Sequence, residues 1–418
     1  MTCAYLEARG LRVVLLAATS LFGLSYPTVA QQAAAPLYVI NANVLDGLTP
    51  RVMRGATIVL SGGDIERIDT TGLRPPVGVE VLDVQGRYVV PGLIDAHSHV
   101  NDLAGVRRAL ESGVTTIRTA GVGGFADVGI RDLVKRGLLQ GPDMVTTGIF
   151  VTPDIGNAVL WDERLYDLHL TGVETEEQLR QLVQINIDHG VDWIKTRTTD
   201  RAGLAERDPR TQIYTERQIR VIVEEAARAG LSVMVHAHGD AGIRAAVLGG
   251  AKSIEHATYA SEETLQLMLE HGTYLVPTLS SISSFGAAGD YSDPALYLRG
   301  LHMAPRRRGV VRRASELGIP IVTGVDTYYR EDSFSRVSRE VGFLVDQGVA
   351  PFDAIRGATS LAAEMLGVED QTGSIQPGLD ADLLVVDLNP LDDIRSLQDI
   401  LVVISNGHVV LKRIPFEK

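Results

Sequence analysis

Six residues that could bind a metal ion follow short apolar segments of the chain. They are His97, His99, His236, His238, His256 and Asp326. Neutral imidazoles and carboxylates are common ligands of divalent metals in proteins. If the apolar segments are parallel strands, their carboxyl ends meet at one edge of the fold, and these side chains converge there. The pattern therefore predicts a hydrolytic metal site.

The spacing of these histidines supports the prediction. Side chains alternate between the two faces of a strand, so Asp95, His97 and His99 lie on one face, and His236 and His238 share a face in the same way. Two imidazoles on one face can bind the same ion. One such pair is a weak indication, because a lone histidine at a strand end is more often packed or solvated. Donors at the same end of several strands favour a metal site.

The other five histidines have ordinary interpretations. His189 and His271 each precede a glycine at an expected helix end, where a cation suits the helix dipole. We expect His169 and His302 in loops and His408 in a strand near the C-terminus. None of these five requires a metal.

Lys195 ends the apolar segment 191–195. An amine among apolar neighbours has a lowered pKa, and the neutral amine can react with carbon dioxide. The product is a carbamate, which is a carboxylate on a long stem and can bridge two cations. The residues alone also leave a surface or phosphate-binding role open for Lys195.

The elements that would position these residues alternate between strands and helices. Helical patterns lie between the strands, for example at 175–189 and 216–229. The candidate strands are 93–100, 114–120, 143–148, 192–199, 232–238, 253–257, 274–279 and 319–326. Eight alternating strands predict an α/β protein with a (β/α)₈ TIM barrel over residues 92–373. A doubly wound sheet is the structural alternative.

Both ends of this region are rich in short strand patterns. Residues 36–91 contain several such patterns, and Gly62-Gly63 separates two of them like a hairpin turn. Residues 374–418 show the same character, with Asn406-Gly407 as a turn. We expect the two segments to form one small composite β-sandwich domain.

The first thirty residues have the order of a secretory signal peptide. Arg9 and Arg12 precede an apolar run at 13–24, and small residues end at Ala30. We therefore expect export, to the periplasm or the exterior, and no membrane attachment after cleavage; an uncleaved anchor is the alternative. Cleavage would also remove Cys3, the only cysteine, so a metal would be held by histidine, carboxylate or a modified lysine.

Composition narrows the class of partner. The net charge is −13, and acidic and basic residues are interspersed without a Lys/Arg-rich run. This distribution argues against nucleic-acid binding. The protein is 45% apolar and 22% charged, which is typical of globular proteins, and we expect a small-molecule substrate.

Two motifs resemble the amidohydrolase superfamily. Residues 90–99, Val-Pro-Gly-Leu-Ile-Asp-Ala-His-Ser-His, match its opening signature, and residues 373–383, Gly-Ser-Ile-Gln-Pro-Gly-Leu-Asp-Ala-Asp-Leu, match its closing stretch. Val-Asp-Trp-Ile-Lys at 191–195 and Val-His-Ala-His-Gly at 235–239 resemble the bacterial Xaa-Pro dipeptidase and ochratoxinase branch. The resemblance implies the barrel with its composite β domain and a homo-oligomer.

The resemblance also implies roles for the donors. His97 and His99 would bind the first metal, and a carboxylated Lys195 would bridge both ions. His236 and His256 would bind the second. Asp326 would bind the first metal and serve as proton shuttle, and His238 would face the substrate. Two divalent ions are implied, with Zn²⁺ as our first choice, although the donors also suit Co²⁺, Mn²⁺ and Fe²⁺.

The implied activity is hydrolysis of an amide C–N bond by a metal-bridging hydroxide. The implied substrate is a dipeptide, an N-acyl amino acid or an ochratoxin-like compound. One alternative is a one-metal deaminase or imidazolonepropionase, although Gly239 follows His238 where those enzymes carry an acidic residue. A second is a non-catalytic assembly protein of the same fold.

Four further side chains could lie near the site. Relatives often read Thr-Val-Arg-Asp where this chain has Thr-Ile-Arg-Thr, so the chemistry near Thr119 is open. Tyr166, Tyr291 and Arg299 are candidates for contact with a substrate carboxylate, with surface roles as the favoured interpretation.

Overall fold

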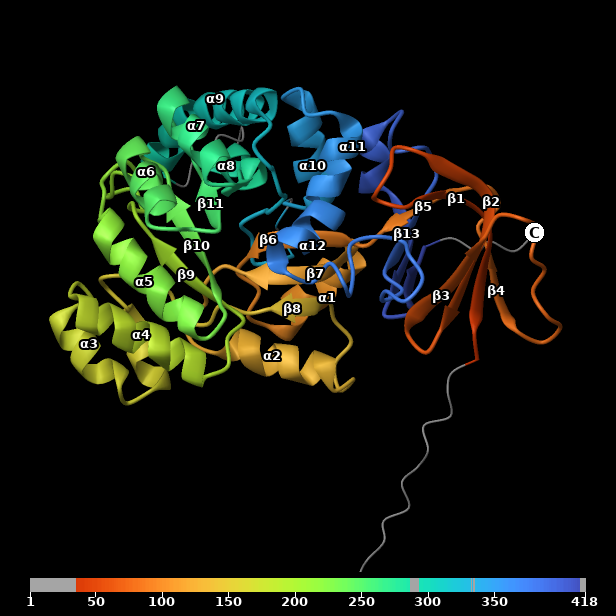
Figure 1. Ribbon diagram of the computed structural model, residues 1–418, viewed down its shortest axis with the longest axis horizontal. Coiled ribbons are helices and arrows are strands. Elements are labelled where there is room, and N and C mark those ends of the chain that lie inside the picture. Colours follow the sequence, from red (N-terminus) through yellow and green to blue (C-terminus); the bar gives the residue numbers. More distant parts are fainter. Residues whose placement is uncertain (1–34, 286–292, 332, 334, 414–418) are drawn as a thin grey trace, which may run out of the picture. The chain divides into compact units, whose positions relative to one another are not determined.

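The computed structural model describes residues 35–285, 293–331, 333 and 335–413 (Figure 1). The predicted signal peptide at 1–30 lies outside the described residues. Within the described ranges, no helix is long and apolar enough to cross a membrane.

Strands from both chain ends form one eight-stranded sheet. Its order is β15-β14-β13-β5-β1-β2-β3, and β4 pairs with β1. The strands are β1 Leu37–Leu45, β2 Val52–Ser61, β3 Asp64–Asp69, β4 Glu80–Asp83, β5 Tyr88–Pro91, β13 Leu383–Val386, β14 Ile400–Ser405 and β15 His408–Lys412. The antiparallel pair of β5 and β13 joins the two ends. Because all eight strands pair in one sheet, this pairing does not confirm the predicted sandwich.

The two predicted hairpin turns of this sheet are confirmed. Gly62 and Gly63 connect β2 to β3, and both have positive φ angles, of +66° and +106°. Asn406 and Gly407 connect β14 to β15, with φ angles of +47° and +75°. Glycine and asparagine tolerate this left-handed backbone better than other residues.

The middle of the chain forms two parallel sheets. One has the order β6-β7-β8 and the other β12-β11-β10-β9. Their strands are β6 Leu93–Ser98, β7 Val114–Thr119, β8 Asp143–Val145, β9 Trp193–Arg197, β10 Ser232–Ala237, β11 Ser253–His256 and β12 Tyr274–Val276. Seven of the eight predicted strands are therefore present.

The prediction of an eighth strand at 319–326 was wrong. Pro320 has no N–H to donate to a ladder. The N–H of Val325 donates to Oδ1 of Asp95 at 3.1 Å instead of to a neighbouring strand, and Asp326 has a positive φ of 55°. The segment is therefore held by single bonds rather than by a continuous ladder.

Isolated bridges connect the two parallel sheets through the segments beside them. They pair Leu275 with Ile321, Ser98 with Thr327, and Val151 with Thr196. The strands thus follow one another as in a TIM-barrel-like fold, but the described residues do not form the predicted closed eight-stranded barrel.

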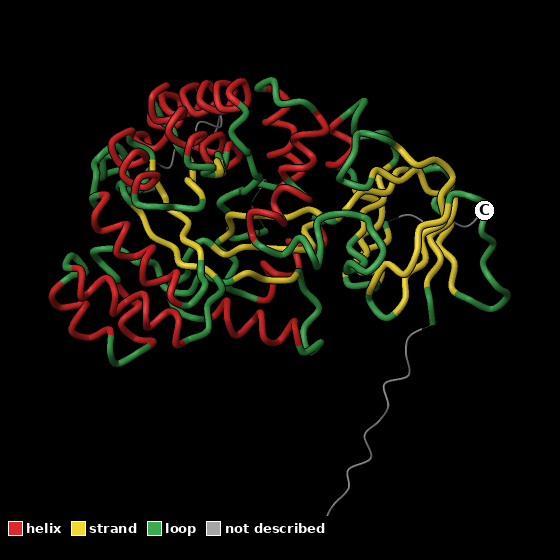
Figure 2. Tube along the Cα trace, viewed as in Figure 1, coloured by secondary structure: helices red, strands yellow, loops and turns green. Residues whose placement is uncertain are grey.

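Helices lie around the parallel strands (Figure 2). The predicted helices at 175–189 and 216–229 are confirmed as α4 and α5, and both begin with a capping box, from Thr175 to Gln178 and from Thr215 to Gln218. The helices are α1 Leu103–Glu111, α2 Ala126–Lys135, α3 Leu165–Thr171, α4 Glu176–Asp188, α5 Glu216–Arg228, α6 Asp240–Leu248, α7 Glu262–Glu270, α8 Leu279–Phe285, α9 Pro294–Leu317, α10 Val337–Asp346, α11 Pro351–Gly357 and α12 Ser360–Leu366, with 3₁₀ turns η1 Gly156–Trp161 and η2 Ile394–Gln398.

The histidines outside the candidate site lie mostly where we expected. His189 and His271 are the C-caps of α4 and α7, and His408 begins β15. His169 and His302 do not lie in loops, because they belong to α3 and α9. α3 is a short helix of seven residues, and α9 contains Pro305, and neither feature marks a helix in the sequence.

Candidate metal centre

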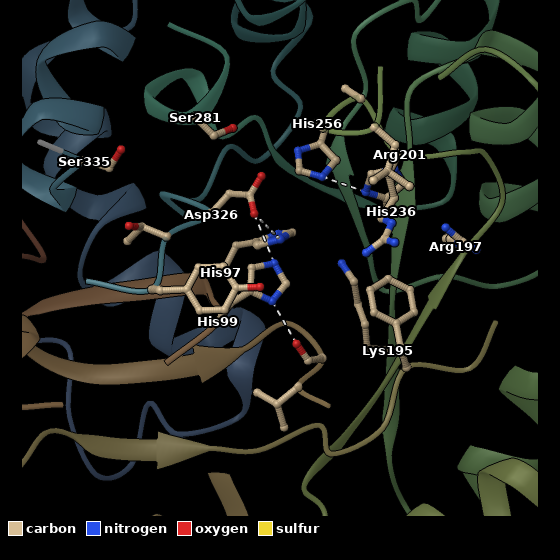
Figure 3. A pocket seen from close by; sticks show the side chains of 18 of the residues that line it. His97, His99, Lys195, Arg197, Arg201, His236, His256, Ser281, Asp326 and Ser335 are labelled. Carbon is tan, nitrogen blue, oxygen red and sulfur yellow. Dashed lines mark hydrogen bonds and ion pairs between the residues drawn. The ribbon is translucent and has the colours of Figure 1, made fainter. Parts of the chain in front are cut away.

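The predicted donors converge at the carboxyl ends of the parallel strands (Figure 3). β6 carries His97, and His99 follows it directly. β9 carries Lys195, β10 carries His236, β11 ends on His256, and Asp326 comes from the segment after β12. Figure 3 shows Lys195 between the group of His97, His99 and Asp326 and the group of His236 and His256. This arrangement suits the predicted ligand roles, which stay a prediction.

One group of donors surrounds the carboxylate of Asp326. Its Oδ1 lies 3.1 Å from Nε2 of His99 and 3.6 Å from Nε2 of His97. His97, His256 and Asp326 each offer one ligand atom, and these three atoms lie within 4.8 Å of one another. A single ion could therefore contact these three side chains.

A second group of donors consists of imidazoles alone. Nδ1 of His236 lies 2.9 Å from Nε2 of His256. Ligand atoms of His236, His238 and His256 lie within 4.8 Å of one another, so His238 is close enough to act as a ligand as well. Burial lowers the pKa of all three imidazoles, and the neutral form is the one that binds metals.

Hydrogen bonds to the outer nitrogens fix the orientation of the imidazoles. Nδ1 of His99 donates to the carbonyl oxygen of Gly121 at 2.8 Å, and Nε2 of His236 donates to the carbonyl oxygen of Asp200 at 3.2 Å. A carbonyl oxygen only accepts, so each of these two nitrogens carries a proton, and the other nitrogen of each ring faces the donors of the site. Such outer hydrogen bonds are typical of histidines that bind metals.

A buried ion pair supports His97 from behind, and the sequence analysis missed it. Nδ1 of His97 lies 2.5 Å from Oε2 of Glu255, and Nη2 of Arg118 lies 3.0 Å from Oε1 of the same carboxylate. Arg118 also donates to the carbonyl oxygen of Ala96 at 2.7 Å. Both charged side chains are fully buried. The available signal was a charged residue inside each apolar strand segment, which is unusual without a partner.

The amine of Lys195 has no hydrogen-bond partner among the described residues, although it is buried. It lies 5.3 Å from the ring centroid of Phe150. Burial lowers its pKa to about 8, against the opposing effect of Glu255. A buried polar group without a partner is costly, so this amine requires an explanation. Carboxylation would convert it into an acceptor at the place where two groups of metal donors meet.

Left-handed backbone is concentrated in the loops of this site. His256, Thr278 and Asp326 have φ angles of +77°, +49° and +55°. Such angles in non-glycine residues store strain and often occur at functional sites. Burial alone would raise the pKa of Asp326, but the hydrogen bond with His99 and the nearby imidazoles keep it below its ordinary value. Asp326 is therefore held in the charged form that binds a cation.

Buried Arg307 lies behind His238 and was also missed. Its Nε donates to Oγ1 of Thr258 at 3.0 Å, and the same oxygen lies 2.9 Å from Nδ1 of His238. Nη1 of Arg307 donates to the carbonyl oxygen of Thr278 at 2.9 Å. The guanidinium comes from α9, far along the chain, so no local pattern indicates this contact.

The departure from the family pattern at Thr119 does not change the cavity. Oγ1 of Thr119 donates to Oδ2 of the buried Asp127 at 2.7 Å, and the backbone N–H groups of Thr147 and Gly148 donate to the same oxygen. Thr119 is fully buried and does not line the cavity. Its hydroxyl instead connects β7 to the loop after β8.

A cavity of about 1250 Å³ opens onto the donors. Besides them it is lined by five arginines, namely Arg197, Arg201, Arg307, Arg330 and Arg339. Of the other candidate contacts, the exposed Tyr166 and the half-buried Arg299 do not line it, and Tyr291 lies outside the described residues. Arg299 instead donates to backbone carbonyl oxygens of the loop 202–207.

The chain resembles known hydrolases over most of its length. It is 27% identical to an ochratoxinase from Aspergillus niger, over 89% of this chain and 85% of that protein. It is 26% identical to an imidazolonepropionase from Symbiobacterium thermophilum, over 80% of this chain and 82% of that protein.

Solved structures give the same result. A Xaa-Pro dipeptidase crystallised with bound methionine superimposes with a TM-score of 0.82 and 26% identity, over 90% of this chain and 99% of that chain. The A. niger ochratoxinase superimposes with a TM-score of 0.77 and 25% identity, over 91% of this chain and 96% of that chain. The family model described as "Amidohydrolase family" matches residues 88–410. The chain belongs to the amidohydrolase family.

Proposed function

We propose that this hydrolase uses two divalent metal ions to cleave the amide C–N bond of an N-acyl amino acid or a dipeptide. The observation that carries the proposal is the buried amine of Lys195, which has no hydrogen-bond partner in the described part of the chain and lies between two groups of donors. A carbamate on this amine would supply the bridging carboxylate that two ions require.

The donors divide between the two positions. His97, His99 and Asp326 would hold one ion, and His236 and His256 the other, with Lys195 between them. The ions, when bound, would lower the pKa of a water molecule and polarise the scissile carbonyl. Zn²⁺ is the ion we favour, because neutral imidazole and carboxylate are its usual ligands without cysteine.

Two residues would handle the proton and the developing charge. Asp326 accepts the proton of the attacking water and delivers it to the leaving nitrogen, so one water and one amide give one acid and one amine. His238 donates a hydrogen bond to the oxygen of the scissile carbonyl as negative charge develops there. The Thr258 hydroxyl at Nδ1 and the nearby Arg307 orient the imidazole of His238 for this role.

The choice of substrate class draws support from relatives and from charge. The similar proteins include an ochratoxinase and a Xaa-Pro dipeptidase. Among the described residues that line the cavity, the arginines outnumber the carboxylates, which belong to Asp154 and Asp326. A surplus of cations attracts an anionic substrate, and an N-acyl amino acid or dipeptide carries a carboxylate.

A one-metal enzyme of the imidazolonepropionase kind is the second candidate. The imidazolonepropionase relative and the group of His236, His238 and His256 both favour it, because three imidazoles suffice for one ion. This candidate gives Lys195 no role, and about one ion per chain would support it.

A substrate panel with metal analysis tests the proposal. Purified protein loaded with Zn²⁺ is assayed on N-acyl amino acids, Xaa-Pro dipeptides and cyclic amides such as imidazolone propionate. We expect hydrolysis of at least one of the first two classes, with about two ions per chain. Hydrolysis of the cyclic amide alone, with about one ion, would overturn the proposal in favour of the second candidate.

A further inference from the structure

The arginines that line the cavity differ in how their guanidinium groups are satisfied. Nε and Nη1 of Arg307 donate to hydroxyl and carbonyl oxygens, and its Nη2 lies 3.4 Å from Nδ1 of His238. Arg330 and Arg339 lie over the rings of Tyr328 and Phe343, at 4.8 Å and 5.9 Å from the ring centroids. These groups already have partners within the protein.

Arg197 is different. Its side chain is only 12% exposed, and its Nε is buried without a hydrogen-bond partner among the described residues. The nearest carboxylate oxygen, Oδ1 of Asp200, lies 3.9 Å from Nη1, which is too far for a hydrogen bond. Asp200 is also shared, because its other oxygen lies 3.9 Å from Arg207. A buried guanidinium whose Nε–H lacks a hydrogen-bond acceptor in the described residues can bind an anionic ligand that enters the cavity.

The position of Arg197 connects it to the metal centre. It follows Lys195 by two residues on β9, so the two side chains leave the same face of the strand. In the register of β9 and β10, Arg197 is the partner of His236. Figure 3 shows Arg197 and Arg201 on the side of the cavity that carries His236. An anion bound there would lie close to the scissile bond.

Hydrogen bonds hold the loop after β9, which contains a second arginine, Arg201. The guanidinium of Arg299 donates to the carbonyl oxygens of Ala202, Leu204, Ala205 and Arg207, at 2.6–3.1 Å. Arg201 begins this loop, is exposed and lines the same cavity. Four bonds from one side chain hold the backbone of this loop against α9, so the backbone next to Arg201 is already fixed before a ligand binds.

We infer that Arg197 is the specificity-determining residue of this site and binds the carboxylate of the substrate, with Arg201 as the second cation. The planar guanidinium matches a carboxylate through two parallel hydrogen bonds. The inference rests on the proposed function, because it names the residue that selects an N-acyl amino acid over a neutral amide. A neutral substrate would leave the buried guanidinium of Arg197 without a carboxylate at hydrogen-bond distance, because Asp200 lies 3.9 Å away.

The test compares an acid with its neutral analogue. Binding of N-benzoylglycine and of N-benzoylglycinamide is measured by calorimetry on metal-free protein, so that no ion can bind the carboxylate. The proteins are wild type, Arg197→Met and Arg330→Met, which removes the same charge from another part of the cavity. The ratio of kcat/KM for the two compounds is then measured on the metal-loaded proteins.

We expect wild type to bind the acid about 10- to 100-fold more tightly than the amide, as for a hydrogen-bonded charge pair. Arg197→Met should abolish this preference and leave binding of the amide within about threefold, whereas Arg330→Met should keep it. The inference is overturned if wild type shows no preference, if Arg197→Met retains it, or if Arg330→Met loses it equally.

The binding and activity measurements separate this inference from the proposed function. An Arg197-dependent preference in binding without hydrolysis of any panel substrate would support the carboxylate site and refute the amide hydrolase. Hydrolysis of N-acyl amino acids with a preference that does not depend on Arg197 would support the hydrolase and refute the carboxylate site.

Discussion

Buried charged groups in this protein occur in two kinds of surroundings. Behind the metal centre, Arg118 and Glu255 are paired with each other, and Glu340 accepts bonds from the backbone N–H of Leu279 and Ser280 at 2.6 Å and 2.7 Å. Facing the cavity, Nζ of Lys195 and Nε of Arg197 have no partner among the described residues. We call the first set the framework and the second the open groups.

This difference in hydrogen-bond partners distinguishes charges that stabilise the fold from groups that bind ligands. A framework charge stabilises the fold only while its partner is present, because an isolated buried charge is costly. An open group already bears that cost in the folded protein, and a bound ligand removes it. Framework variants should therefore act on folding, and variants of the site should act on metal binding, substrate binding and rate.

The largest effect is expected at Asp326. Asp326→Asn should lower kcat/KM by about 10⁴-fold, because an amide cannot shuttle the proton and binds a cation more weakly. Asparagine tolerates the left-handed backbone at this position, so the melting temperature should change little. Steady-state kinetics and thermal unfolding check both expectations.

Asp154→Asn is the matched control, because Asp154 is the second carboxylate among the described residues that line the cavity. Its Oδ1 accepts a bond from the N–H of Gly156 at 2.9 Å, and the side-chain oxygen of asparagine can do the same. An equal loss of activity in both variants would attribute the effect to charge in the cavity rather than to proton transfer.

The framework should respond in stability. Arg118→Met leaves Glu255 buried without its cation and should lower the free energy of unfolding by about 3–5 kcal/mol. Urea denaturation measures this change. Arg210→Met breaks an exposed pair with Asp208 and should leave the free energy of unfolding nearly unchanged. If the two variants proved equally stable, Arg118 would not belong to the framework.

The smallest effect concerns pH. Asp382 accepts bonds from the N–H of Asn406 at 3.0 Å and the hydroxyl of Thr372 at 2.8 Å, and no cation of the described ranges pairs with it. Burial, with nearby Asp143 and Asp380, raises its pKa to about 7. Between pH 4 and 7 the folded protein therefore keeps a proton that the unfolded chain has lost, so stability falls as pH rises through this range.

Asp382→Asn should reduce this fall by on the order of 2 kcal/mol between pH 5 and pH 8. The comparison is urea unfolding at both pH values. Asp399→Asn, at a side chain that is 80% exposed, should leave the pH dependence unchanged. A slope unaltered by Asp382→Asn would mean that other groups cause it.

The sequence was sufficient for features that depend on local patterns. Alternation along a strand predicted His97 and His99 on one face, and the helical patterns at 175–189 and 216–229 predicted α4 and α5. The convergence of the donors followed from parallel strands, whose carboxyl ends share one edge.

Features that depend on distant contacts could not be predicted. Arg118 and Glu255 are 137 positions apart, and no periodicity reports their pairing. The segment 319–326 has a strand-like composition, but its N–H groups go to Asp95 and to single backbone partners. The openness of Arg197 likewise depends on where Asp200 lies after folding. These are properties of packing, which local composition does not encode.

The most direct test of the account is the metal content of Lys195→Met, set beside wild type after loading with Zn²⁺ in bicarbonate buffer. Methionine fills the space of the lysine stem but cannot form a carbamate. We predict about two ions per chain in wild type and about one or fewer in the variant, with activity lost in parallel. Retention of two ions and full activity by Lys195→Met would contradict the bridging role of Lys195.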